Sequence, residues 1–418
     1  MPEKLTMTYE SEIRDTLDRL GRENEHLRYI SYFLNCAWNW FDPVQQRTRK
    51  PAVAVLGPGV PEELILAAGT IPYCILGGSL KSTAWSDDLV PRDTDPVSRS
   101  VLGFLQAPEG PDFSGTLFLI PVSSDSMRKT AYLLQEQGCR VHIVDVPPRR
   151  SDPLAREKWR AQMLRMTEAV AHHTRTRVTA ARLRDAVETV EAARTALREF
   201  LDITCRREDL ITGAARLLVQ NSYYYVKNLR QWTVQLERLN EELKFRRRRY
   251  ASRNADRPGI LLMGSPVYFP NYKVPFLIQD IGLTVLENID VTSMKLQPNT
   301  ISAGKGMRRD RLIRLVADSW YSQDGSPAYT SNRALVRSAS QCLKQEHVEG
   351  VVYHVLKGQI EYDFELEQLE QLFDSQGIPV FRLETDYQYQ DVEQLRIRME
   401  AFSEMLTQNR YREERKAQ

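Results

Sequence analysis

The C-terminal stretch from Glu349 to Leu406 reads EGVVYHVLKGQIEYDFELEQLEQLFDSQGIPVFRLETDYQYQDVEQLRIRMEAFSEML, which is an alternating α/β pattern. Val348 to Leu356 is a short apolar run that predicts a buried strand. Phe364 to Phe373 has helical spacing and closes at Gly377, and a second strand is expected immediately afterwards. Because strand, helix and strand follow one another with short turns, the stretch predicts neighbouring parallel strands.

The same alternation extends upstream through two regions of the chain. Residues 258–410 form one region, and residues 51–150 form an earlier one that has its own apolar runs and turns. The remaining strands are expected at Ala52–Leu56, Ile71–Leu76, Gly115–Pro121, Arg140–Val146, Gly259–Met263, Leu283–Ile289 and Pro379–Glu384. We therefore predict an α/β protein with two doubly wound, Rossmann-like parallel-sheet lobes.

Three further segments flank these lobes. Residues 1–50 are expected to form an N-terminal helical arm, because Tyr9 to Phe33 has helical spacing before Asp42-Pro43 breaks the pattern. Residues 151–257 are expected to form a helical insert between the lobes. Tyr223, Tyr224 and Tyr225 lie in this insert, where packing is the expected role and stacking on a ligand the alternative. Residues 411–418 are predicted to be a polar tail.

Composition and charge limit the function. The chain has 418 residues, of which 42% are hydrophobic, so large cores can be buried. Lys plus Arg number 57 against 55 for Asp plus Glu, a near balance that argues against bulk nucleic-acid binding. The basic run Arg246–Arg249 is interpreted as the solvated end of a long charged helix.

Neither a targeting segment nor a membrane span is expected. Met1 to Leu20 is charged and polar and lacks the apolar core of a signal peptide. No apolar run approaches the roughly 20 residues that cross a bilayer. We therefore expect a cytoplasmic protein that does not enter a membrane.

Common catalytic motifs are missing. The sequence has no Walker A pattern, no GxGxxG opening a helix, no HExxH and no GxSxG. His172-His173 is expected to be exposed in the helical insert, so no metal site is predicted there. Five scattered cysteines without a CxxC pattern are expected to be buried thiols: Cys36, Cys74, Cys139, Cys205 and Cys342.

The strand-end loops carry a family resemblance. The loop after the strand at 348–356 continues as Lys357-Gly358-Gln359, the next strand is followed by Thr385-Asp386-Tyr387, and the last helix carries Glu393 to Phe402. This stretch resembles the family of 2-hydroxyacyl-CoA dehydratases and ATP-dependent benzoyl-CoA reductases. Matching features recur upstream at Pro61–Leu64, Ala67–Gly69 with Pro72, Asp95–Ser100, Ser124-Asp125 with Lys129, and Gly264–Pro266.

The resemblance has implications for cofactors. Family members hold a [4Fe–4S] cluster largely through cysteine thiolates from these loops, and an ATP-driven activator protein supplies one electron. The corresponding positions here are Gly57, Asp95, Ser124 and Gln359, none of which is a cysteine. Because iron at such a site needs thiolate ligands, the resemblance implies no cluster and no metal on this chain. The cluster is then expected in a partner subunit.

Other polar residues at strand ends are candidates for a substrate pocket. They are Glu62, Ser265, Lys357, Tyr362, Asp386 and Arg396. The competing interpretation is structural: Glu62 as a charge in a first helical turn, Asp386 and Arg396 as groups that stabilise a lobe, and Asp95 and Gln359 as polar turn residues. No catalytic residue is assigned on this chain.

Three functions remain open. The first is a cluster-free subunit of an acyl-CoA dehydratase or reductase complex in anaerobic metabolism, paired with a cysteine-bearing homologue in a heterodimer. There it would complete the acyl-CoA site and the subunit interface, and the partner would carry catalysis. The second is a catalytic subunit whose cluster has atypical ligands. The third is a non-redox binding or scaffold protein that shares only the fold.

Overall fold

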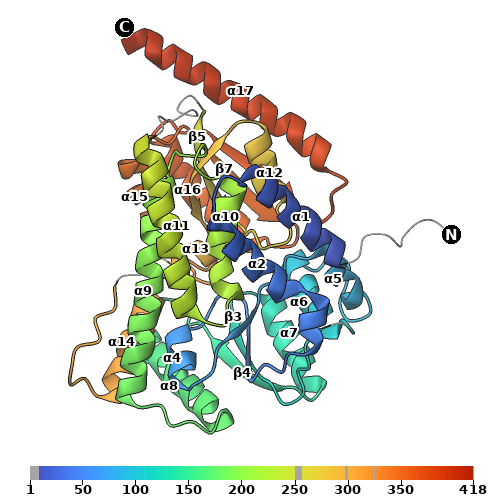
Figure 1. The fold of residues 1–418 in the computed structure, drawn as a ribbon, viewed down its shortest axis with the longest axis vertical. Coiled ribbons are helices and arrows are strands. Elements are labelled where there is room, and N and C mark those ends of the chain that lie inside the picture. The colour runs from blue at the N-terminus through green and yellow to red at the C-terminus, as the bar shows by residue number, and fades with distance from the viewer. Residues whose placement is uncertain (1–8, 109, 250–256, 297–299, 324, 418) are drawn as a thin grey trace, which may run out of the picture.

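The structure is a computed structural model that describes residues 9–108, 110–249, 257–296, 300–323 and 325–417. Two four-stranded parallel sheets lie one above the other along the long axis of the molecule (Figure 1). The first has the order β2-β1-β3-β4 and the second the order β6-β5-β7-β8, so both use the same winding. This confirms the predicted α/β class with two Rossmann-like lobes.

All eight predicted strands form, with ends shifted by two residues or fewer. Every strand pair in both sheets is parallel, as short apolar runs alternating with helices predict. The strands are β1 (Val53–Leu56), β2 (Tyr73–Ile75), β3 (Leu117–Val122), β4 (Arg140–Asp145), β5 (Gly259–Gly264), β6 (Thr284–Ile289), β7 (Gly350–Leu356) and β8 (Val380–Thr385).

The helices of the two lobes follow the strands in sequence. The first lobe contains α4 (Glu62–Ala67), α5 (Leu80–Thr83), the 3₁₀ turn η1 (Ala84–Ser86), α6 (Pro96–Gln106) and α7 (Asp125–Glu136). The second contains α12 (Lys273–Asp280), α13 (Val291–Leu296), α14 (Arg309–Gln323), α15 (Arg333–Gln345), α16 (Glu361–Asp374) and α17 (Val392–Ala417). Helices α5, α6 and α13 were not predicted, although Asp95 and Pro96 are typical of a helix start.

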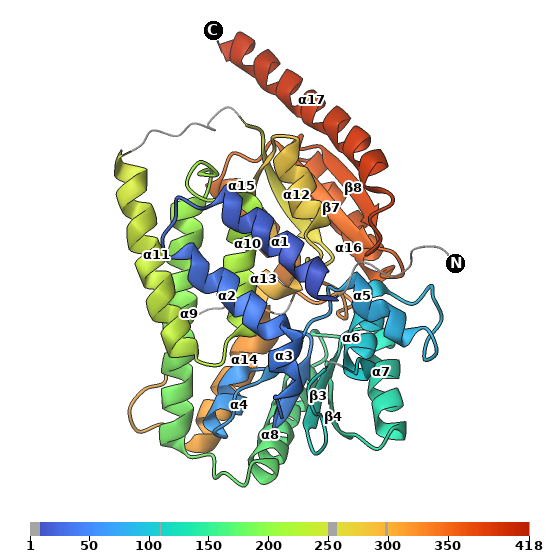
Figure 2. The ribbon, with the colours of Figure 1, turned by 45° about the vertical axis from the view of Figure 1, so that its right-hand side comes forward.

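The described part of the N-terminal arm is helical and consists of three helices, with a break between Glu23 and Ile30 inside the run that has helical spacing. They are α1 (Tyr9–Glu23), α2 (Ile30–Phe41) and α3 (Pro43–Arg47). Asn24 breaks the first helix: its side-chain Nδ2 donates to the Leu20 carbonyl, and its Oδ1 accepts from the backbone N–H of Thr212. The chain then packs α1 and α2 across the front of the helical insert (Figure 2).

The insert is helical, as predicted. It comprises α8 (Ala155–His173), α9 (Ala180–Thr204), α10 (Gly213–Asn221), the 3₁₀ turn η2 (Ser222–Tyr225) and α11 (Leu229–Arg249). The long helices α9 and α11 lie side by side in both ribbon views (Figures 1 and 2). Helix α11 ends in the basic run at Arg249, in agreement with the helix-terminus interpretation.

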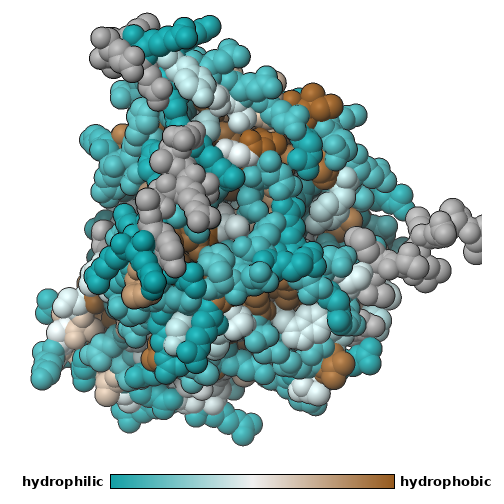
Figure 3. Space-filling model, turned by 45° about the horizontal axis from the view of Figure 1, so that its top comes forward, coloured by the Kyte–Doolittle hydropathy of each residue, from teal (hydrophilic) through white to brown (hydrophobic). Residues whose placement is uncertain are grey.

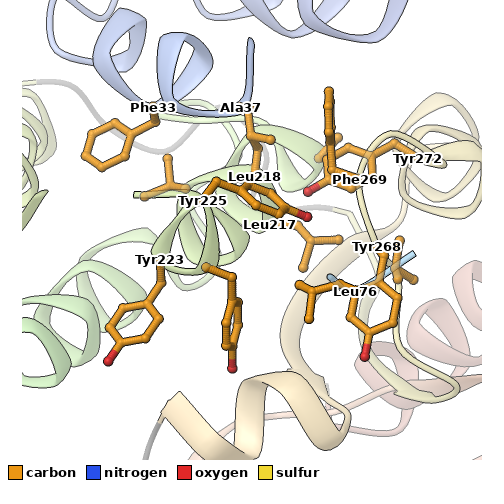
Figure 4. Packing of buried hydrophobic residues seen from close by; sticks show 14 of the residues in the cluster. Phe33, Ala37, Leu76, Leu217, Leu218, Tyr223, Tyr225, Tyr268, Phe269 and Tyr272 are labelled. Carbon is orange, nitrogen blue, oxygen red and sulfur yellow. The ribbon is translucent and has the colours of Figure 1, made fainter. Parts of the chain in front are cut away.

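An aromatic core joins the arm, the insert and both lobes. Tyr223 and Tyr225 from η2 lie among Phe33 of α2 and Phe269 and Tyr272 of the second lobe (Figure 4). The Tyr225 ring lies edge-on to Phe269, with centroids 6.5 Å apart. The predicted packing role of this tyrosine cluster is therefore confirmed for all three rings, which are buried.

Two helices of the second lobe extend beyond it. Helix α14 packs on α8, and the Trp159 indole Nε1 donates to the Ala317 carbonyl at 2.7 Å. This contact ties the C-terminal half of the chain to the core of the first lobe. Helix α17 continues to Ala417 and projects past the body (Figure 1), so residues predicted to be a tail extend a helix instead.

The described helices include none that is long and apolar enough to cross a membrane. The face in Figure 3 is mostly hydrophilic, and its hydrophobic residues form small separate groups. Large exposed apolar side chains are scattered over several elements.

Candidate functional site

A small cavity lined by both polar and apolar residues lies between the two lobes, at the carboxyl ends of the strands. We call it the interlobe cavity. It encloses about 70 Å³, which is room for only a few water molecules. All four positions that the resemblance assigns to the cluster line this one cavity: Gly57, Asp95, Ser124 and Gln359. Residues separated by 302 positions (from 57 to 359) are thus brought together at the expected edge of the sheets.

Two of these side chains cap helices. Asp95 is the N-cap of α6, and its Oδ1 accepts from the backbone N–H of Ser98 at 3.0 Å. Ser124 is the N-cap of α7, and its Oγ accepts from the backbone N–H of Met127 at 3.2 Å. Each side chain satisfies a helix N–H group that would otherwise lack a partner, so both have a structural role independent of any ligand.

Gln359 connects the lobes. Its Nε2 donates to Asp95 Oδ1 at 3.3 Å, while its buried Oε1 has no hydrogen-bond partner among the described residues. The preceding residue, Gly358, has a φ of +85°, and a Cβ there would lie 3.2 Å from the backbone of Asp95. The loop after β7 can therefore approach the α6 N-terminus closely only with glycine at this position.

The donor atoms around the interlobe cavity do not fit an iron–sulfur cluster. Gly57 has no side chain, and the other three positions offer only oxygen or amide nitrogen. The nearby Glu361 carboxyl has its pKa raised, mainly by burial and then by the charges of Asp95 and Asp125. The described residues also include no set of three metal-ligating side chains arranged to hold an ion. Cluster chemistry needs soft thiolates that this set does not supply.

The described cysteines lie elsewhere. Cys74 is buried in β2, and burial raises the pKa of its thiol. None of the five cysteines lines the interlobe cavity, and no disulfide joins them. Cys74 and Cys342 are buried, so the expectation of buried thiols is confirmed for these two, whereas Cys36, Cys139 and Cys205 are only partly buried.

The substrate-pocket candidates separate into different places. Tyr362 lines the interlobe cavity. Ser265 is buried below it, where its Oγ accepts from the Leu356 backbone N–H at 3.0 Å. Lys357 and Asp386 form an ion pair of 3.2 Å on the loops after β7 and β8, and Lys357 is exposed. Arg396 lies on α17, away from the cavity.

Arg396 stabilises the packing of α17. Its guanidinium lies 3.6 Å from Asp280 of α12 and 3.8 Å from Glu393 of its own helix. These contacts agree with the structural interpretation given above for this residue.

A larger cavity adjoins the first across Gly57 and Pro58, which line both. We call it the insert cavity, because α9, η2 and the start of α11 close it against α4 and β2. It encloses about 260 Å³ and is lined mainly by apolar and aromatic side chains. Glu62, the remaining substrate-pocket candidate, lines it together with Tyr223 and Cys74.

A buried ionic network supports one wall of the insert cavity. Arg194 of α9 is 1% exposed and lies 2.9 Å from Glu63, 3.1 Å from Glu62 and 3.5 Å from Glu191. Trp320 Nε1 also donates to Glu63 at 3.1 Å. Buried charges need such partners, and the single cation is shared among three carboxylates.

The Glu62 side chain, which lines the insert cavity, has a raised pKa. Its Oε1 accepts a 2.5 Å hydrogen bond from the Tyr223 hydroxyl. Burial, together with the neighbouring Glu63 charge, raises its pKa to about 7, although Arg194 acts in the opposite direction. A carboxyl with this pKa exchanges a proton at neutral pH, so this group can donate or accept a hydrogen bond at the cavity wall.

The sequence predicted Glu62 as a pocket residue, but it did not predict the ion pair that links Glu62 to Arg194. Arg194 lies on the apolar stripe of α9 beside Val190 and Leu197, and an arginine in such a stripe signals a buried ion pair. Glu62 and Glu63, two of its three carboxylate partners, are more than 130 residues away, so their identity depends on the fold.

Comparisons with known proteins identify a family for this chain. A family model described as 2-hydroxyglutaryl-CoA dehydratase, D-component, matches residues 59–406. Among similar proteins is the "Putative dehydratase subunit YjiM" of Escherichia coli (strain K12), 26% identical over 364 residues, covering 85% of this chain and 91% of the relative.

Two further relatives are characterised as subunits by their names. The (R)-phenyllactyl-CoA dehydratase beta subunit of Clostridium sporogenes is 20% identical and covers 86% of this chain and 93% of its own length. The (R)-2-hydroxyglutaryl-CoA dehydratase subunit beta of Acidaminococcus fermentans is 22% identical. The alignment covers 85% of this chain and 93% of that relative. Because the family model spans well over half of the sequence, this chain belongs to the 2-hydroxyglutaryl-CoA dehydratase D-component family.

Proposed function

We propose that this chain is the cluster-free subunit of a 2-hydroxyacyl-CoA dehydratase or benzoyl-CoA reductase-like complex. It pairs with a homologous, cysteine-bearing subunit, and helps to form the acyl-CoA site and the subunit interface. Catalysis and the [4Fe–4S] cluster belong to that partner, which an ATP-dependent activator protein supplies with electrons. Family membership and the subunit names of two relatives support this proposal.

One observation carries the proposal. Four positions from four separate loops line a single cavity at the strand ends, and they supply oxygen, amide or no side chain where a cluster needs thiolates. Asp95 and Ser124 cap helices, and Gln359 donates a hydrogen bond to Asp95. The cavity is thus held together by protein contacts that need no metal.

Anaerobic copurification tests the proposal directly. A tag on this chain should recover the cysteine-bearing homologue from cells that express both and the maturation machinery. All iron in the complex should stay with the homologue when the two are separated, and this chain alone should be colourless. A chain that stays alone beside that homologue contradicts the proposed pairing.

The second candidate, atypical cluster ligation, rests on the unpartnered Oε1 of Gln359 next to Asp95. The paired variant Asp95→Ala with Gln359→Ala distinguishes the two candidates. If the chain is cluster-free, iron per complex is unchanged in this variant. A loss of iron, with the complex still assembled, favours atypical ligation.

Thiolate restoration tests whether these loops are the cluster positions. The triple variant Asp95→Cys, Ser124→Cys and Gln359→Cys places three thiols on one cavity. We expect about four iron atoms per chain after anaerobic reconstitution with iron and sulfide. A matched control carries three cysteines at exposed positions of α9, namely Ala181, Ala192 and Thr195. Equal iron uptake by both variants contradicts the assignment of these positions.

A further inference from the structure

The insert cavity has the properties of an apolar binding pocket. Its volume of about 260 Å³ is several times that of the interlobe cavity and lies just below the range of drug-sized pockets. Its buried lining includes Val55, Val60, Ile65, Tyr224 and Trp320. A group that enters it leaves water for apolar surface, which is favourable by roughly 25 cal/mol per Å² of apolar area.

Positive charge is not offered to a ligand inside this pocket. Arg194 stands behind the wall and does not line the cavity, and three carboxylates already surround it. The cations that do line the cavity, Lys227 and Arg230, are exposed, and Arg230 is bound to Asp185 at 2.6 Å. A carboxylate in the buried part would therefore meet Glu62 and lose its hydration without gaining a cation.

The residues that line the mouth of the insert cavity are exposed, and two of them are cations, so a polar part of a ligand can lie there. Ile71, which is 45% exposed, lines the cavity on the first-lobe side, and Lys227 and Arg230 line it at the start of α11. A whole CoA thioester exceeds 260 Å³, so only its acyl portion fits inside. The anionic CoA portion then extends toward solvent past these two cations.

We infer that the insert cavity binds an uncharged, apolar acyl group, aliphatic or aromatic, of a CoA thioester and rejects acyl groups that carry a second carboxylate. This inference rests on the proposed function, because the thioester comes from the family relationship. Among the relatives, phenyllactyl-CoA and 2-hydroxyglutaryl-CoA name one substrate of each class. The charge distribution of this chain selects the first class.

Calorimetric titration of the purified full chain tests the inference. The probes are 4-methylpentanoyl-CoA, glutaryl-CoA and CoA itself. We expect the apolar thioester to bind at least about tenfold more tightly than the other two, because burying an unpaired carboxylate is costlier than leaving it in water. Equal or tighter binding of glutaryl-CoA overturns the inference but leaves the proposed function standing. If neither thioester binds better than CoA, the acyl-CoA role and the inference both fail.

A charge added at the mouth sharpens this test. Ile71→Arg places a cation at a half-exposed position that lines the cavity, and should narrow the preference for the apolar thioester by about tenfold. Val234→Arg is the matched control: Val234 is also 45% exposed, but it does not line the cavity. The control should keep the wild-type preference. An identical change in both variants shows that the cavity does not select the acyl group.

Discussion

The two cavities share Gly57 and Pro58 but differ in size and construction. The interlobe cavity is small, and helix caps and a hydrogen bond between the lobes close it. The insert cavity is larger and apolar, and a buried ion network supports its wall. The difference supports our proposals that the interlobe cavity of this chain holds no cluster and that an acyl group binds in the insert cavity.

The largest effect is expected from the network behind the insert cavity. Arg194→Ala removes the cation beside Glu63, whose side chain is fully buried, and should lower the unfolding free energy by about 3–5 kcal/mol. Urea denaturation measures this change. Arg14→Ala is the control: its ion pair with Glu10 is exposed and should contribute less than about 1 kcal/mol. A similar small change in both variants would show that the buried carboxyls do not need the cation.

Protonation of Glu62 should give the next largest effect. Folding raises its pKa from 4.5 to about 7, so the folded state holds a proton that the unfolded chain releases in this range. The stability that this group contributes is therefore at its full value at and below pH 4.5. It falls by about 3 kcal/mol as the pH rises to about 7. Glu62→Gln removes the titration.

Stability measured against pH in both proteins isolates this group from other titrating residues. The wild-type stability minus that of Glu62→Gln should fall between about pH 4.5 and 7 and level off above. A difference that stays flat, or rises, through this window means that Glu62 remains ionised in the wall of the insert cavity.

Substitution of exposed apolar residues beside the interlobe cavity should have a smaller effect, on the affinity for the partner subunit. Ile360 and Phe364 follow Gln359, lie one helical turn apart and are 66% and 69% exposed. If the partner subunit covers this edge, Phe364→Glu should weaken the complex by about tenfold in a pull-down titration. Ile397→Glu on α17, at 67% exposure, is the matched control. Equal weakening by both variants places the interface elsewhere.

The sequence predicted the strands well because parallel buried strands are short apolar runs bounded by turns. The family resemblance also assigned Gly57, Ser124 and Gln359 to one site, and these residues do line one cavity. They follow strands of two different sheets, so strand pairing alone does not predict that they meet. The N-terminal arm was harder. Asn24 ends α1 through contacts with Thr212, which lies 188 residues away and has no local signal.

The insert cavity could not be predicted for a similar reason. Its walls come from α4, α9 and η2, which the helical periodicity shows only as separate amphipathic segments. Tyr223 read as a packing residue, and it does pack, but its hydroxyl also binds Glu62. Whether a buried tyrosine also contacts a cavity depends on how far its neighbours fill the space, which no local pattern encodes.

The smallest expected effect concerns the hydrogen bond that joins the lobes. Gln359→Ala removes the donor to Asp95, worth about 1 kcal/mol, but it also removes a buried Oε1 that has no partner among the described residues. The two changes offset each other, so unfolding should shift by less than about 1 kcal/mol. Gln359→Glu instead faces Asp95 with a second carboxylate, and should destabilise the chain more at pH 8 than at pH 5. Equal stability of these two variants at pH 8 would show that the loop after β7 does not press against Asp95. The interlobe cavity would then be an open site instead of a closed junction.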